Sequence, residues 1–137
     1  MPTEREDILY LDVEDVLVLF AELFGCSVET ARDQLSRAEL LESALARPAQ
    51  YAYYRDADLA LQAAVIAHGI AESQSFVDGN KRTAELATLA FLDINGYEMS
   101  ASDREEEELA AWIIELSEGL TPDDLAERLR PRLGLKN

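Results

Sequence analysis

Two nearly unbroken apolar segments occupy the middle of the chain. The first covers residues 57–71 and the second covers residues 84–94. A helix that is apolar on nearly all sides is a buried helix. We therefore expect these segments to form a central pair of core helices, joined by the polar, glycine-containing stretch between them.

Signals at the ends of the flanking segments predict further helices around this pair. Asp12 is suited to cap a first helix that Gly25 ends, and Ser27 is suited to cap a short second helix. Ser36 with Glu39 forms a capping-box pattern for a third helix. This pattern places at least three helices before the central pair.

The third helix is expected to stop at Pro48, because proline removes a helical hydrogen bond and clashes with the preceding turn. After it, Tyr51 and Tyr53 alternate with Ala52, which is typical of an extended segment. A second interpretation is that these tyrosines cover the edge of the core with their hydroxyls in water. Both interpretations fit the residues equally well.

The second half of the chain carries similar signals. Asp56 and Asp78 are expected to cap the two central helices, and Gly96 follows the second of them. Ser102 begins a capping box for a sixth helix, and Thr121 precedes a proline and two acids that suit the start of a last one. We therefore predict one all-α domain over residues 1–137, a helical bundle around the central pair.

Charge and composition narrow the classes of partner. The chain has 137 residues, 48% of them hydrophobic, and a net charge of −16. Such an acidic protein repels the phosphate backbone of nucleic acids, so we expect no nucleic-acid partner. No apolar run reaches the ~20 residues that span a bilayer, so we expect no membrane association. A charged start without a signal peptide and a single cysteine, Cys26, favour the reducing cytoplasm.

The polar stretch between the central helices concentrates residues that bind phosphate. A helix that begins near Asn80 directs free backbone N–H groups at its own start. Gly79 allows close backbone approach, Arg82 offers a fork of donors, and Lys81 adds a point charge. Asp78 supplies a hard oxygen ligand suited to Mg²⁺, or serves only as a helix cap.

The same stretch resembles the Fic/Doc (Fido) superfamily, whose motif reads His-x-Phe-x-Asp/Glu-Gly/Ala-Asn-x-Arg. The positions in register are Phe76, Asp78, Gly79, Asn80 and Arg82, and Lys81 completes the Asn-Lys-Arg form of the death-on-curing (Doc) branch. Residues 40–48, Leu-Leu-Glu-Ser-Ala-Leu-Ala-Arg-Pro, resemble a second run of that branch. Two motifs in the right order make the resemblance more specific than either alone.

The resemblance implies a Fic/Doc-type helical fold that binds ATP and Mg²⁺. It implies that Asp78 binds the metal and that Asn80 contacts phosphate and holds the loop. It also implies a short β flap at Tyr51 and Tyr53 that aligns a target segment by strand-like pairing. Glu85 replaces the second arginine of adenylylating relatives, so transfer of the γ-phosphate is expected before transfer of AMP. Family partners would be a small antitoxin and a target hydroxyl on a translation factor.

Gln74 stands where the family has its catalytic histidine. Glutamine does not titrate in the useful range, so it cannot act as a general base, although it can orient a hydroxyl. Loss of a general base costs typically ~10²–10⁴-fold in rate. His68 lies six residues earlier and is expected to be packed within the fold, and Glu72 is a weak alternative base.

Three functions stay open. The first is a toxin-fold pseudoenzyme that keeps nucleotide and Mg²⁺ or antitoxin binding but is catalytically impaired. The second is an active phosphotransferase in which Gln74 or Glu72 orients the target hydroxyl, because a loose phosphoryl transition state depends more on positioning than on base catalysis. The third is a helical interaction module with a vestigial site.

Overall fold

The computed structural model describes residues 8–99 and 103–136, and these residues form a helical bundle with one very small sheet. The elements in chain order are α1 (Val13–Phe24), α2 (Val28–Gln34), α3 (Ala38–Arg55), α4 (Leu59–Ser73), α5 (Asn80–Ile94), β1 (Tyr97–Met99), α6 (Asp103–Leu116), α7 (Pro122–Leu129), a 3₁₀ turn (Arg130–Arg132) and β2 (Leu133–Leu135). The all-α class predicted from the sequence is confirmed.

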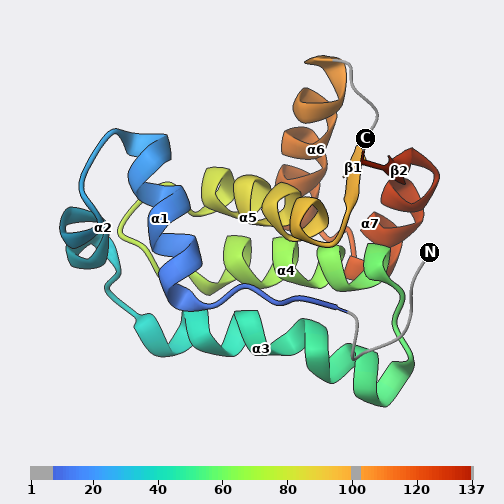
Figure 1. Cartoon of the computed structure of the whole chain (residues 1–137), viewed down its shortest axis with the longest axis horizontal. Helices are drawn as coiled ribbons and strands as arrows, with labels where there is room; N and C mark the ends of the chain where they lie inside the picture. Colours follow the sequence, from blue (N-terminus) through green and yellow to red (C-terminus); the bar gives the residue numbers. More distant parts are fainter. Residues whose placement is uncertain (1–7, 100–102, 137) are drawn as a thin grey trace.

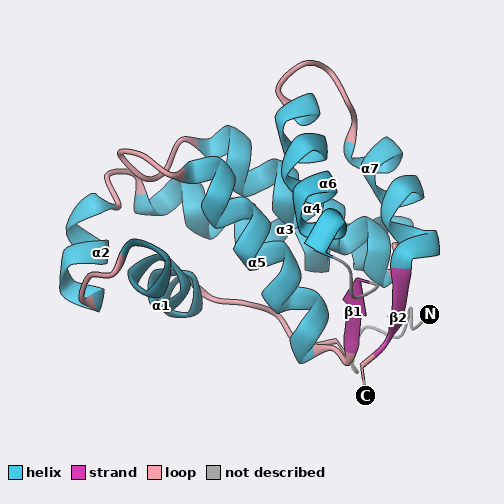
Figure 2. Cartoon of the chain, turned by 90° about the horizontal axis from the view of Figure 1, so that it is seen from above, coloured by secondary structure: helices cyan, strands magenta, loops and turns pink. Residues whose placement is uncertain are grey.

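The helices α4 and α5 run side by side through the middle of the bundle, and α3 packs on the other side of α4 (Figure 1). The elements α1 and α2 lie at one end of the molecule, and the two strands lie toward the other (Figure 2). The loop between α4 and α5 is at the α2 end (Figure 1). The candidate site therefore lies at the end of the molecule opposite the small sheet (Figure 1 and Figure 2).

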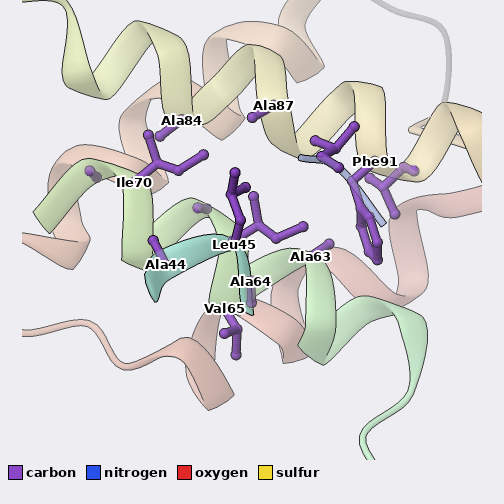
Figure 3. Packing of buried hydrophobic residues seen from close by; sticks show 14 of the residues in the cluster. Ala44, Leu45, Ala63, Ala64, Val65, Ile70, Ala84, Ala87 and Phe91 are labelled. Atoms are coloured by element: carbon purple, nitrogen blue, oxygen red, sulfur yellow. The ribbon is translucent and has the colours of Figure 1, made fainter. Parts of the chain in front are cut away.

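The predicted central pair is confirmed by burial. Nearly every residue of α4 from Leu59 to Ala71 is buried, and α5 faces it with small side chains that include Ala84 and Ala87 (Figure 3). A Cβ added at Gly69 would lie only 3.0 Å from the Cβ of Ala44 on α3. The three central helices therefore pack closely through small residues.

Several predicted helix ends are also confirmed. The side chains of Asp12, Ser27 and Thr121 accept hydrogen bonds from the first turns of α1, α2 and α7. Gly25 ends α1 in the left-handed conformation, with φ of 65°. Local capping chemistry therefore decided these boundaries, as expected.

The prediction that the third helix stops at Pro48 is wrong, and so is the extended segment after it. The helix α3 continues through Pro48 to Arg55, so Tyr51 and Tyr53 lie on its last turns rather than on a β flap. Tyr51 is half-buried and Tyr53 is 67% exposed. The apolar stripe of α3 explains the difference, because its burial against α4 outweighs the helical cost of one proline, about 3 kcal/mol. The buried residues of this stripe are Leu41, Ala44, Leu45, Pro48 and Ala52.

Three predicted caps do not form. Ser36 donates its hydroxyl to the carbonyl of Ser75 instead of capping α3. Asp56 adopts the left-handed conformation at the end of α3, and Asp58 caps α4 in its place. Asp78 makes no cap hydrogen bond, since the cap position of α5 is Gly79. Of the three residues that occupy these cap positions, Arg37, Asp58 and Gly79, only Asp58 has an extended backbone and a side-chain cap hydrogen bond.

The small sheet was not predicted. β1 and β2 pair antiparallel, with Tyr97 opposite Leu135 and Met99 opposite Leu133. The expected cap at Ser102 lies outside the described residues. Within the described part of the chain, no helix has the length and apolar character needed to cross a membrane.

Asp58 joins α4 to the C-terminal elements. Its carboxylate accepts hydrogen bonds from Arg130 Nε at 2.6 Å and Nη2 at 3.1 Å, and from the backbone N–H of Leu61 at 3.0 Å. Burial alone would raise the pKa of Asp58, but these hydrogen bonds outweigh it and hold the pKa below its usual value. The ionised carboxylate therefore stabilises the folded state.

Replacing Asp58 with asparagine should lower the free energy of unfolding by about 1 kcal/mol at pH 7, because asparagine still caps the helix but loses the ion pair. A lowered folded-state pKa contributes stability above the usual carboxylate pKa, and this stability is lost as the pH falls through the folded value. The gap between parent and D58N should therefore close below about pH 4. Urea unfolding at pH 7 and below about pH 4 measures this difference in the free energy of unfolding. The charge-matched control is D33N on α2. A gap of the same size at both pH values would contradict the assignment.

Candidate functional site

The loop between α4 and α5 is held by the connection between α2 and α3. The carbonyl oxygen of Ser75 accepts hydrogen bonds from the backbone N–H groups of Ser36, at 2.9 Å, and Arg37, at 3.0 Å. The N–H of Val77 donates to the carbonyl of Gln34 at 2.9 Å. An antiparallel bridge between Leu35 and Phe76 lies between these bonds. The loop is therefore paired like a short strand, although it belongs to no named strand.

Phe76 anchors the loop to the core. Its side chain is 2% exposed and stacks on Phe20 of α1, with ring centroids 4.4 Å apart. Because Phe76 follows Ser75 directly, its burial keeps this part of the loop against the core. The positions of the neighbouring polar residues depend on this anchor.

Asn80 closes the loop with its side chain. Its Oδ1 accepts the N–H of Phe76 and its Nδ2 donates to the carbonyl of Phe76, both at 3.0 Å. The side chain is buried, with 8% of the residue exposed. The loop-holding role expected of Asn80 is therefore confirmed, and its contact with phosphate stays a prediction.

Gly79 has φ of 80°, a left-handed conformation that favours glycine. A Cβ at this position would collide with the ring of Phe24, the last residue of α1. Phe24 is 42% exposed and also contacts Phe20. The contact of Phe24 with Gly79 was not predictable from the sequence, since apolar spacing marks Phe24 only as part of α1.

Asp78 is exposed beside Gly79 and is not a helix cap. Its Oδ1 accepts the N–H of Gly79 at 2.8 Å, and no described residue bonds its other oxygen. The described residues contain no group of three acidic, histidine or cysteine side chains that could hold a metal. A single exposed carboxylate suits Mg²⁺, which is commonly bound by one or two carboxylates together with phosphate oxygens and water.

Lys81 and Arg82 lie exposed in the first turn of α5. Neither forms an ion pair with a described residue. Their positive charges add to the partial positive charge of the helix start. The structure thus brings Asp78 and both cations to the beginning of one helix.

Gln74 ends α4 in the left-handed conformation, with φ of 54°. Its side chain is exposed, whereas the neighbouring Ser75 is fully buried and hydrogen-bonded to the hydroxyl of Ser73. Left-handed backbone costs free energy for a residue other than glycine and is often found at functional sites. Gln74 therefore has a strained backbone directly before the loop that carries the predicted phosphate site.

His68 and Glu72 lie on α4 ahead of Gln74. His68 is half-buried, and its pKa is lowered by burial, with Glu72 opposing and Arg47 adding to the shift. A lowered pKa keeps the imidazole neutral at pH 7. Within the described part of the chain, no hydrogen bond links His68 to the loop, which agrees with the expectation of a packed histidine.

Comparison with known proteins identifies the family of the chain. The model of the Fic/DOC family matches residues 10–92, which include α1 to α4, the whole loop and α5 as far as Leu92. The chain is 41% identical over 103 residues to a protein named Toxin Doc from Mycolicibacterium smegmatis (strain ATCC 700084 / mc(2)155), across 72% of this chain and 75% of that relative. The chain therefore belongs to the Fic/DOC family, in its Doc branch.

Proposed function

We propose that this chain is a Doc-type toxin-fold protein that binds ATP with Mg²⁺ and transfers phosphate poorly or not at all. The observation that carries the proposal is the start of α5, where two exposed cations without an ion-pair partner among the described residues adjoin the exposed carboxylate of Asp78. In a protein with a net charge of −16, such a cluster favours an anionic ligand.

Each residue of the cluster has a distinct role in this proposal. The free N–H groups in the first turn of α5, next to Gly79, donate hydrogen bonds to the phosphates, because a helix start is a ready anion site. Arg82 grips phosphate oxygens with its fork of donors, and Lys81 adds a point charge. Asp78 would hold Mg²⁺. The bound ion would neutralise phosphate charge and orient the phosphate chain of the nucleotide.

Catalysis is expected to be impaired because Gln74 occupies the position of the base. Its amide can donate to and accept from a target hydroxyl, but it cannot remove the proton. A second candidate function, an active phosphotransferase, is favoured by the left-handed backbone of Gln74, a conformation often found at functional sites. Its amide could orient a hydroxyl, and positioning contributes much of the rate of phosphoryl transfer. AMP transfer is less favoured, since Glu85 replaces the second arginine of adenylylating relatives.

The partners follow from the family and from the name of the relative. A toxin of this type would act with a small antitoxin and modify a hydroxyl on a protein such as a translation factor, in the cytoplasm. Tyr51 and Tyr53 stay candidates for target docking, although they would do so from a helix. A protein that binds no nucleotide would instead be an interaction module with a vestigial site.

Replacing Arg82 with alanine should weaken Mg²⁺-dependent ATP binding by at least about tenfold, because a hydrogen bond to a charged group contributes about 1.5–3 kcal/mol. Titration calorimetry with and without Mg²⁺ measures the affinity. The matched control is R47A, since Arg47 is an exposed arginine on α3. Equal affinity of R82A and the parent would remove Arg82 from the site.

A further inference from the structure

Most cationic side chains that the structure describes are neutralised by a carboxylate. The six ion pairs are Arg32–Glu14, Arg55–Asp123, Arg128–Glu115, Arg130–Asp58, Arg132–Glu108 and Lys136–Asp93. The remaining described cations, which form no ion pair with a described residue, are Arg37, Arg47, Lys81 and Arg82. Although the chain has 28 acidic residues, four of the ten described cations thus have no carboxylate partner among the described residues.

Three of these four cations adjoin the same loop. Lys81 and Arg82 follow the loop directly in α5, and the backbone N–H of Arg37 donates to the carbonyl of Ser75 at 3.0 Å. This hydrogen bond fixes the α-carbon of Arg37 beside the loop, and its long side chain is exposed there. Arg47 lies ten residues further along α3, nearly three helical turns away.

The position of Arg37 is unfavourable for its own helix. Arg37 occupies the N-cap of α3 and makes no side-chain cap hydrogen bond. Serine, threonine, aspartate and asparagine are the favoured caps, and a positive charge opposes the partial positive charge of a helix start. A residue that breaks a local rule without a structural partner is a candidate for function.

We propose that Arg37 is a third cation of the phosphate site, where its guanidinium binds the phosphate chain of the nucleotide together with Lys81 and Arg82. The inference rests on the proposed nucleotide binding and adds a residue from α3 to it. Three positive charges around one loop repel each other, and a polyphosphate of opposite charge relieves that repulsion. The planar fork of arginine suits two phosphate oxygens at once.

Binding of inorganic triphosphate and of ATP with Mg²⁺ tests the inference, by titration calorimetry on the full chain. R37Q should weaken both affinities by about tenfold, as expected for a lost charge-assisted hydrogen bond. R37K should recover part of the loss, because lysine keeps the charge but not the fork. R47Q makes the same change in net charge on the same helix and should stay within about twofold of the parent at physiological salt.

The melting temperature of R37Q should equal or exceed that of the parent, since the change removes a positive charge from a helix start. A clear loss of stability in R37Q would therefore overturn the argument from the cap position. Equal affinities of R37Q and the parent, with R82A still weakened, would overturn the role of Arg37 alone. Equal loss of affinity in R37Q and R47Q would show that net charge causes the effect, and would also overturn the role of Arg37. A parent that binds neither probe would overturn this inference and the proposed function together.

Discussion

Replacing Gln74 with histidine should raise phosphoryl transfer from ATP to a protein hydroxyl by about 10²–10⁴-fold, the usual contribution of a general base. The family motif has histidine at this position, and the rest of the motif is present from Phe76 to Arg82. The loop is already held by Asn80 and by the α2–α3 connection, so the new imidazole would enter an ordered frame. Its pKa near neutrality suits proton removal at pH 7.

Label transfer into cell-extract protein measures this change, with γ-³²P-ATP and α-³²P-ATP in parallel. The control is Q74N, because asparagine tolerates the left-handed backbone but offers no base. Label from the γ position only with Q74H would support an intact site that lacks its base. Label with the parent would favour the active phosphotransferase, and Q74H no better than Q74N would show that the loop is not poised for chemistry.

Replacing Phe76 with alanine should lower the free energy of unfolding by about 3–5 kcal/mol, the usual cost of removing a buried phenylalanine. The ring is 2% exposed and stacks on Phe20, so its loss leaves a cavity between α1 and the loop. Because domains are stable by only about 5–15 kcal/mol, this single change would remove a large part of the total.

Urea unfolding followed by far-UV circular dichroism measures the loss. The matched control is V77A, at the next position of the same loop, where the side chain is 68% exposed. That variant should stay within about 0.5 kcal/mol of the parent, as surface changes usually do. A loss below about 1 kcal/mol in F76A would contradict the anchoring role.

The sequence by itself determined the features that depend on local pattern. The apolar runs of α4 and α5 predicted the central pair, since helices without a polar face must be buried. The caps at Asp12, Ser27 and Thr121 were predictable because a cap involves only the next few residues. The motif from Phe76 to Arg82 indicated the family and the candidate site, because it too lies within a few neighbouring residues.

The tertiary structure alone decided how the site is held and where α3 ends. The carbonyl of Ser75 bonds to the N–H groups of Ser36 and Arg37, which lie nearly forty residues earlier. Phe24 covers Gly79 across an even longer stretch of chain. Such contacts leave no local signal, since they arise only when helices pack. The same holds for α3, which continues through Pro48 because its apolar stripe is buried against α4.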